Sequence, residues 1–338
     1  MMTWLCVARD VATSDVPRPS HHFVATLPPG IPNRGKSNES IAVIKRGDMN
    51  PVSVKAEGAA STMAAVVSGH HAVTLELAKK ESAEHLNQAM LELFASMRNR
   101  PLTAKAYALG DANAPKVEGK NVKVVHFVRH GQGFHNLLAD LAIQDGREWE
   151  QYSKSKSNPY VMAELLDAPL TDKGRQQALL LQPKIQAFVD QPEMVVVSSQ
   201  CRAIQTGLLA FDHLVRKVKF IAHEDVRECT GVHTCDKRRP KSLQEKEFPK
   251  VDFTQIKSEE DGLFMDDRRE SKKEIGERIY KFLSWMYDRS ETHIGVASHS
   301  GWLMAVFNGV VECDESLKSW FQTGEMRSVV LEFVRNDD

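Results

Sequence analysis

The chain has 338 residues, of which 42% are hydrophobic, so it can bury one large core or two modest ones. Its 44 Lys and Arg residues nearly balance 45 Asp and Glu residues, which leaves a formal net charge of -1. This balance gives no general signal for binding nucleic acid or an anionic membrane, so any specificity for anions must come from a local cluster.

The cysteines and the apolar segments indicate a cytoplasmic protein. Five scattered cysteines, with no Cys-x-x-Cys pair, fit neither a disulfide framework nor a common zinc pattern, and we expect reduced thiols and no metal site. The most apolar stretch, residues 294–311, contains polar residues that predict a strand, a turn and a helix instead of a membrane span. No secretory signal is visible, and import into an organelle through the Ser-, Thr-, Pro- and Arg-rich residues 1–40 is the alternative to a cytoplasmic location.

The N-terminal third of the chain divides into an extension, a helix and a linker. Residues 1–68 show no periodicity and predict a disordered extension. From residue 72 to 97, apolar residues recur at about 3.6-residue spacing and predict an amphipathic helix: Leu75, Leu86, Ala89, Met90, Leu93 and Met97. This helix could dock on the core, pair with another chain or bind a partner, and docking is the simplest expectation. A linker then completes the segment 69–120.

Residues 121–335 alternate between predicted strands and helices. The strands are short β-branched runs at 122–128, 194–199, 218–222, 293–298 and 328–334. Helical patterns lie at 178–188, where Pro183 is expected to kink or split the helix, and at 275–286. This alternation predicts an α/β fold in which helices cover both faces of a mostly parallel sheet, a three-layer α/β/α sandwich preceded by the N-terminal extension.

Chemically reactive side chains directly follow four of the predicted strands. They are found in the segments Arg129–Gly131, Ser198–Thr206, Arg227–Glu228 and Ser298–Gly301. Ligands of open α/β sheets bind just outside the carboxyl ends of the strands. The arginines, histidines and carboxylate of these segments would therefore form a cationic pocket with a single acid.

Such a pocket suits phosphoryl transfer. Guanidinium groups bind phosphate oxygens in bidentate fashion, and a helix that starts near Ser300 adds backbone donors. A neutral imidazole can attack phosphorus to form a covalent intermediate, and a carboxylic acid can protonate the leaving alkoxide. Neither a metal nor an organic cofactor is required, because the side chains supply the positive charge.

The order of the motifs resembles a known family. The strand that ends in Arg129-His130-Gly131, the segment Leu170–Gly174, the segment Ser198–Thr206 and Val296–Gly301 are together similar to the histidine phosphatase superfamily, in its phosphoglycerate mutase-like branch. The resemblance covers roughly residues 121–335 and implies a phosphoglycerate mutase-like catalytic domain there. Each of these residues taken alone is compatible with a structural role, but the four motifs together favour an active site.

The resemblance implies a role for each site residue. His130 would be the nucleophile that becomes phosphorylated, and the phosphoryl group would be held by Arg129, Arg202, His299 and, as a further ligand, Asn136. Glu228 would be the proton donor, because Ser300 stands where the acid-phosphatase branch has an aspartate. Glu224 and Asp225 are nearby alternatives.

Other polar residues near these motifs are expected to have lesser roles. His126 and His135 fit structural or rim positions better than catalytic ones. The run Lys237-Arg238-Arg239 is either solvated or directed toward a substrate. The segments 136–170 and 234–267 are expected to cover the pocket.

The resemblance leaves three classes of function. The family typically continues from Arg-His-Gly into Glu-Ser and Trp-Asn, whereas this chain has Gln132-Gly133-Phe134-His135-Asn136. That departure favours a phosphatase acting on a small phosphorylated metabolite over a phosphoglycerate mutase-type phosphotransferase. The third class is a non-catalytic interaction protein that uses the helix at 72–97, which is disfavoured because all the catalytic positions are present. The sequence does not indicate an oligomeric state.

Overall fold

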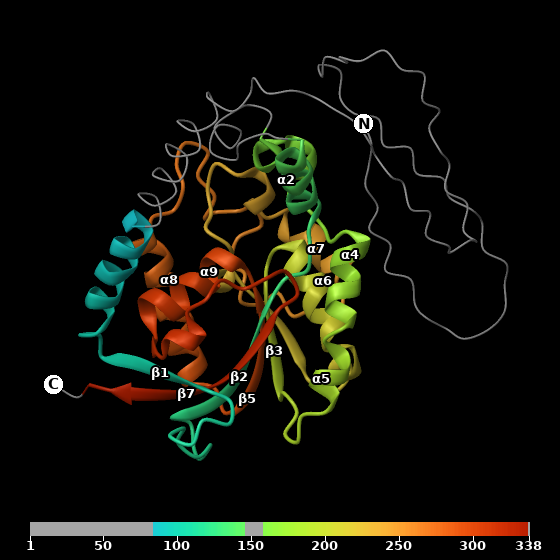
Figure 1. The fold of residues 1–338 in the computed structure, drawn as a ribbon. Coiled ribbons are helices and arrows are strands. Elements are labelled where there is room, and N and C mark those ends of the chain that lie inside the picture. The colour runs from blue at the N-terminus through green and yellow to red at the C-terminus, as the bar shows by residue number, and fades with distance from the viewer. Residues whose placement is uncertain (1–83, 146–157, 337–338) are drawn as a thin grey trace, which may run out of the picture. The chain divides into compact units, whose positions relative to one another are not determined.

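The computed structural model describes residues 84–145 and 158–336, and Figure 1 shows their arrangement. The predicted extension (residues 1–68) and the first part of the predicted helix (residues 72–83) lie outside the described residues. No helix within the described ranges is both long enough and apolar enough to cross a membrane.

The described residues contain a seven-stranded sheet with the strand order β4-β3-β5-β2-β7-β1-β6. The strands are β1 (Leu102–Ala108), β2 (Val122–Arg129), β3 (Met194–Ser198), β4 (Lys219–His223), β5 (His293–Ser298), β6 (Glu312–Cys313) and β7 (Met326–Arg335). Strands β4, β3, β5 and β2 are mutually parallel, whereas β7 runs antiparallel to both β2 and β1. The prediction of a mostly parallel sheet is confirmed.

Helices cover both faces of this sheet (Figure 1). One face is covered by the helix over residues 84–97, α8 (Lys272–Tyr287) and α9 (Ser300–Ala305). The other face is covered by α4 (Asp172–Leu179), α5 (Gln182–Gln186) and α6 (Cys201–Ala210). Successive residues of a strand point to opposite faces. Accordingly, Met194 and Val196 of β3 pack in one core cluster, and Val195 and Val197 pack in the other. The three-layer α/β/α prediction is confirmed.

The remaining helical elements connect these layers. They are α2 (Phe134–Gln144), α7 (Lys241–Glu247), a π-helical turn η6 (Val306–Val310) and the short 3₁₀ turns η1 (Pro159–Val161), η2 (Ala163–Leu165), η3 (Asp212–Leu214), η4 (Glu224–Val226), η5 (Thr234–Asp236) and η7 (Glu315–Leu317). The predicted helix over 178–188 is split as expected. Because Pro183 suits the first turn of a helix and not its interior, α4 ends at Leu179 and α5 begins at Gln182.

The sheet already begins with β1, which lies within the segment 69–120 that was interpreted as a helix and a linker. The sequence of β1, Leu-Thr-Ala-Lys-Ala-Tyr-Ala, has few β-branched residues and gave no strand signal. Its partner is distant in the chain, since Leu102 pairs with Arg335. Strand β6 was missed because it has only two residues.

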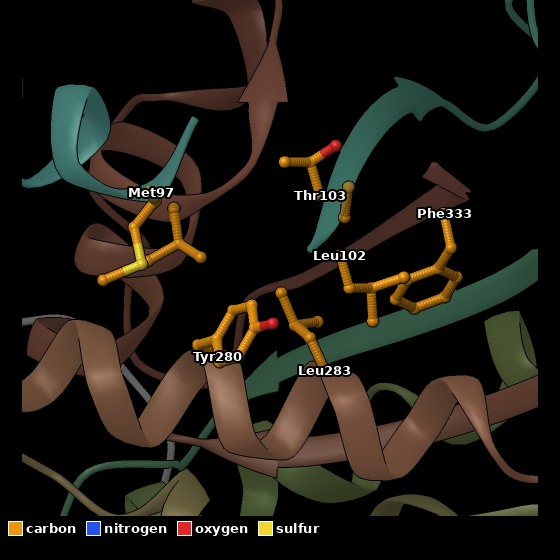
Figure 2. A pocket seen from close by; sticks show the side chains of 8 residues that line it. Met97, Leu102, Thr103, Tyr280, Leu283 and Phe333 are labelled. Carbon is orange, nitrogen blue, oxygen red and sulfur yellow. The ribbon is translucent and has the colours of Figure 1, made fainter. Parts of the chain in front are cut away.

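The helix over 84–97 docks on the core, as predicted. Met90, Leu93 and Met97 are buried in the same cluster as α8, whereas Leu91 is 63% exposed. The Leu93 side chain has room there because residues 276 and 309 are glycines. A Cβ at either Gly276 or Gly309 would collide with it. Near the end of this helix, Met97, Leu102, Tyr280, Leu283 and Phe333 line a small apolar pocket (Figure 2).

Two leucines of this helix provide a test of the docking. Leu93→Ala is expected to lower the free energy of unfolding by about 2–4 kcal/mol, because it leaves a cavity in the core. Leu91→Ala on the exposed face is the matched control and is expected to change it by less than about 0.5 kcal/mol. Urea unfolding followed by circular dichroism measures both. Equal changes in the two variants would contradict the docked position.

Candidate active site

The reactive segments meet at the carboxyl edge of the parallel strands. The last residue of β2, Arg129, is in register with the last residue of β5, Ser298. The backbone N–H of His130 donates to the carbonyl of Ser298 over 2.9 Å, which fixes the chain just beyond both strands. The rings of His130 and His299 are consequently 4.9 Å apart, centroid to centroid. The pairing of β2 with β5 therefore brings the two predicted histidines together.

His130 is held as a neutral imidazole with a defined tautomer. Its Nδ1 lies 2.7 Å from the carbonyl oxygen of Gly131, and because a carbonyl only accepts, Nδ1 carries the hydrogen. Burial lowers the pKa of His130 well below its usual range, and the guanidinium groups of Arg202 and Arg129 lower it further. The lone pair is thus on Nε2, which accepts a hydrogen bond of 3.3 Å from Nε of Arg202. An imidazole in this state can act as a nucleophile.

The two predicted phosphate-binding arginines, Arg129 and Arg202, are held in place by different partners. Arg202, in the first turn of α6, donates from Nη1 to the carbonyl of Cys235 over 2.6 Å and from Nη2 to Oδ1 of Asp236 over 2.7 Å. Arg129 donates from Nη1 to the carbonyl of Phe321 over 2.7 Å. The buried Nε of Arg129 has no hydrogen-bond partner among the described residues, so it is available for an anion.

His299 is fully buried directly before α9. Its Nε2 lies 2.8 Å from the hydroxyl of Ser198 at the end of β3. Burial lowers the pKa of His299 well below its usual range, and the neighbouring Arg202 and His130 add to this effect. Its Nδ1 has no partner within the part of the chain that the structure describes. His299 therefore also presents a free ring nitrogen in the cluster.

The segment Leu170–Gly174 supports the turn that follows His130. A Cβ at Gly131 would collide with the backbone of Gly174, and a Cβ at Gly174 would collide with the backbone of Gln132. The N–H of Gly131 donates to Thr206 Oγ1 over 3.1 Å. Close backbone packing therefore requires glycine at both positions. The motif Arg129-His130-Gly131 and the segment Leu170–Gly174 are in direct contact.

Glu228 lies at the beginning of α9. Its carboxylate accepts hydrogen bonds from the backbone N–H groups of Gly301 and Trp302, each over 3.1 Å. A Cβ at Gly301 would collide with this carboxylate, so the glycine allows the approach. Burial lowers the pKa of Arg129, and the charge of Glu228 opposes that shift. Glu228 therefore acts electrostatically on the site.

The two alternative acids have other partners. Glu224 accepts a hydrogen bond of 2.7 Å from Nε of the buried Arg238. Asp225 lies near His223, with 3.9 Å between Oδ2 and Nδ1, and burial raises the pKa of its carboxyl group. Among the three in the described structure, only Glu228 accepts hydrogen bonds at its carboxylate from the start of α9.

His135 and Asn136 occupy the first turn of α2. His135 is buried with its ring 5.8 Å from that of His130, so it lies inside the cluster and not at its rim. Asn136 Oδ1 accepts from the N–H of Gly133 over 3.1 Å and caps the helix. Its Nδ2 lies 3.5 Å from the hydroxyl of Tyr160.

Both segments expected to cover the pocket reach this cluster. Tyr160 of η1 packs against His135 with ring centroids 5.2 Å apart, and Oγ1 of Thr234, the first residue of the second segment, donates to the carbonyl of Val161 over 3.1 Å. Residues 146–157 of the first segment lie outside the described residues. The two predicted covering segments therefore meet beside His135.

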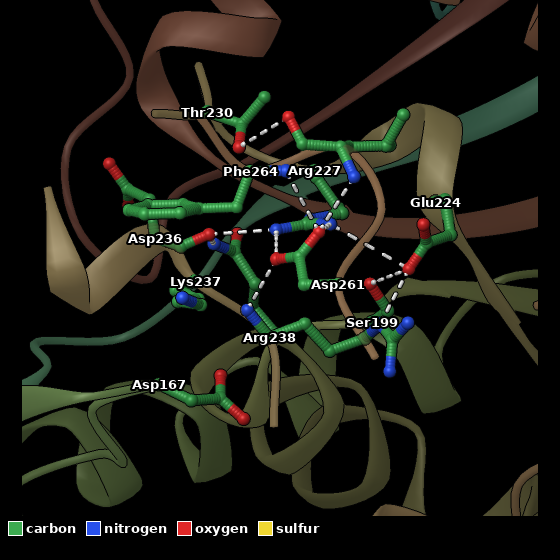
Figure 3. A network of polar contacts seen from close by, with 12 residues as sticks. Asp167, Ser199, Glu224, Arg227, Thr230, Asp236, Lys237, Arg238, Asp261 and Phe264 are labelled. Carbon is green, nitrogen blue, oxygen red and sulfur yellow. Dashed lines mark hydrogen bonds and ion pairs between the residues drawn. The ribbon is translucent and has the colours of Figure 1, made fainter. Parts of the chain in front are cut away.

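The two arginines of the run Lys237-Arg238-Arg239 have structural roles. They are neither solvated nor directed toward a substrate, which were the two expectations for this run. Arg238 is buried and donates to Glu224 (Figure 3). It also donates to the carbonyls of residues 258–260. Arg239 pairs with Asp167 and Glu247. These guanidinium groups are thus committed to internal partners.

Sequence reasoning missed Asp236, which binds Arg202. In the sequence it stands directly before a basic run, and nothing local distinguishes it from a solvated acid. Its burial depends on segments that fold around it from elsewhere in the chain. No group of three or more His, Cys, Asp or Glu side chains in the described ranges is arranged to hold a metal ion.

Comparisons with known proteins found several relatives with phosphoglycerate mutase in their names. Phosphoglycerate mutase-like protein 1 of Arabidopsis thaliana is 32% identical over 242 residues, which cover 62% of this chain and 81% of that protein. A probable phosphoglycerate mutase of Arthroderma benhamiae is 26% identical over 256 residues, covering 73% of this chain and 74% of that protein. Among solved structures, phosphoglycerate mutase from Bacillus anthracis aligns with a TM-score of 0.40 at 15% identity, covering 66% of this chain and 95% of that one.

The family model described as the histidine phosphatase superfamily (branch 1) matches residues 125–337. This match spans more than half of the chain and includes all four motifs found in the sequence. The chain therefore belongs to the histidine phosphatase superfamily, branch 1, and has phosphoglycerate mutase-like proteins among its relatives.

Proposed function

We propose that this protein is a phosphatase that hydrolyses phosphomonoesters of small molecules through a phosphohistidine on His130. The observation that carries the proposal is the state of His130, a buried neutral imidazole whose Nε2 faces Arg202. The substrate phosphoryl group would replace that hydrogen bond. Nε of Arg202 would then face a phosphoryl oxygen, together with Arg129 and His299, and Nδ2 of Asn136 would be a further donor.

The proposed reaction has two steps. In the first, which starts with Glu228 protonated, the Nε2 lone pair attacks phosphorus, the P–O bond to the leaving group breaks, and Glu228 gives its proton to the departing alkoxide. In the second, the Glu228 carboxylate takes a proton from water, the water oxygen attacks phosphorus, and the N–P bond breaks to release phosphate. The arginines stabilise the charge on the transferring oxygens in both steps.

The alternative is a mutase, which returns the phosphoryl group to an acceptor instead of to water. The names of the relatives favour it. A phosphoglycerate also carries a carboxylate, which needs a cation outside the phosphate site. The internal pairing of Arg238 and Arg239 removes the two arginines of the basic run as its source, and this supports the phosphatase.

The two activities separate in one pair of assays. The purified protein is expected to release phosphate from p-nitrophenyl phosphate and not to convert 3-phosphoglycerate into 2-phosphoglycerate, with or without 2,3-bisphosphoglycerate. Conversion without phosphate release would establish the mutase instead. Absence of both reactions would contradict the proposed chemistry and favour an interaction role. Since the apolar face of the helix over 84–97 is already buried, such a role would need another surface.

A further inference from the structure

Asp236 is the only carboxylate among the described residues that forms an ion pair with Arg202. Its Oδ1 accepts from Nη2 of Arg202 over 2.7 Å, and the adjacent carbonyl of Cys235 accepts from Nη1. Both terminal nitrogens of the guanidinium are therefore anchored to one short turn, η5. The remaining nitrogen, Nε, is the one that reaches Nε2 of His130.

The other oxygen of Asp236 is held from the opposite side. Oδ2 accepts from Nη1 of Arg269 over 2.8 Å, and the same nitrogen donates to the carbonyl of Gly231 over 2.8 Å. Burial disfavours the charged form of Asp236, but the nearby His233, whose Nδ1 lies 3.7 Å from Oδ2, and the charges of Arg269 and Arg202 hold its pKa well below the usual range. Asp236 is therefore a fixed anion between two guanidinium groups.

The turn that carries Asp236 is also tied to the segment of Glu228. The Gln200 side chain donates from Nε2 to the carbonyl of Asp236 over 2.8 Å and accepts at Oε1 from the N–H of Glu228 over 3.2 Å. Residues 228–236 thus place the proposed proton donor at one end and the anchor of Arg202 at the other.

We propose that Asp236 is a positioning residue that orients Arg202 so that its Nε faces the nucleophilic nitrogen of His130. This inference rests on the proposed function. Arg202 can stabilise charge on a transferring phosphoryl group only from a defined position, and a misplacement of about 1 Å can cost on the order of 100-fold in rate. Asp236 itself touches no reacting atom in this arrangement and acts through Arg202.

The test is a double-mutant cycle with Asp236→Asn and Arg202→Ala, assayed with p-nitrophenyl phosphate. Asp236→Asn alone is expected to lower kcat by about 10- to 100-fold with a smaller change in KM, since orientation matters most in the transition state. In the Arg202→Ala background the same substitution is expected to change kcat by less than about twofold, because the group it positions is gone.

Asp261→Asn is the matched control for a purely structural role. Asp261 forms a buried bidentate pair with Arg227, which contacts Asp236 only at its backbone carbonyl (Figure 3). We expect it to lower stability as Asp236→Asn does but to leave kcat per folded molecule within about twofold of wild type. Thermal unfolding gives the stabilities, and circular dichroism at the assay temperature gives the folded fraction.

Three outcomes would overturn the inference: unchanged kcat in Asp236→Asn, an equal loss in Asp261→Asn, or a full additional loss in the Arg202→Ala background. If Asp236→Asn does not fold, Asp236→Glu replaces it, because it keeps the charge and displaces it by one methylene. The double-mutant cycle is then made with Asp236→Glu and Arg202→Ala, and the expected loss of kcat is smaller. A wild-type protein without phosphatase activity would instead contradict the proposed function, so the two failures are distinguishable.

Discussion

Replacing His130 by asparagine is expected to lower the rate of p-nitrophenyl phosphate hydrolysis by at least about a thousandfold. Asparagine offers a side chain of similar size and polarity, but its amide has no lone pair comparable to that of Nε2. The covalent step is then lost, whereas the binding of phosphate by Arg129 and Arg202 persists. Stopped reactions quenched in alkali, in which phosphohistidine survives, should show the modified residue at position 130 in wild type and no phosphohistidine in the variant.

His126→Asn is the control for this substitution. His126 lies on β2, the strand that leads to His130, and is also buried, but its ring stacks on Phe188 with centroids 4.1 Å apart, and its Nδ1 lies 2.7 Å from Ser328 Oγ. The change is expected to cost stability and to leave the rate per folded molecule unaltered. Retained activity in His130→Asn, or phosphohistidine at another position, would refute His130 as the nucleophile.

The strands that were predicted from sequence are those whose burial can be seen locally. Strand β2 and the short strands β3, β4 and β5 are largely buried on both faces, so each appears as a short, mainly apolar run that contains β-branched residues. Strand β1 has no such pattern, because it is held by pairing with β7 at the other end of the chain. The antiparallel direction of β7 was also invisible, since an apolar run does not reveal which way a strand enters the sheet.

The same distinction applies to the site. His130 and His299 could be placed because each directly follows a strand, and Arg202 because it opens the helix that comes after one. Asp236 and Arg238 could not, because their partners Arg202 and Glu224 stand 34 and 14 residues away. The depth of His135 could not be read from the sequence, because it depends on how Tyr160 covers the ring. Residues that react can thus be read from local position, whereas residues that orient them depend on tertiary contacts.

Glu228→Gln is expected to reduce kcat/KM strongly for substrates with poor leaving groups and weakly for those with good ones. An alkyl monoester such as benzyl phosphate expels a strongly basic alkoxide that needs a proton as the bond breaks, and we expect a loss of about 100- to 10,000-fold. p-Nitrophenolate leaves without a proton, so the loss should be about tenfold or less. The parameter kcat/KM is informative here because it reports the first phosphoryl transfer.

This dependence on the leaving group separates proton donation from the structural role of Glu228. The carboxylate also caps α9 through Gly301 and Trp302, and the glutamine oxygen preserves only part of that cap. Loss of the helix cap would slow the hydrolysis of every substrate by the same factor. Loss of the proton donor would slow substrates with poor leaving groups more than those with good ones. Glu224→Gln, which weakens the contact with Arg238, is the control. It should lower kcat/KM for both substrates by the same factor, because it affects only the stability of the protein. Equal losses for both esters in Glu228→Gln would leave Glu228 as a cap and require another proton donor.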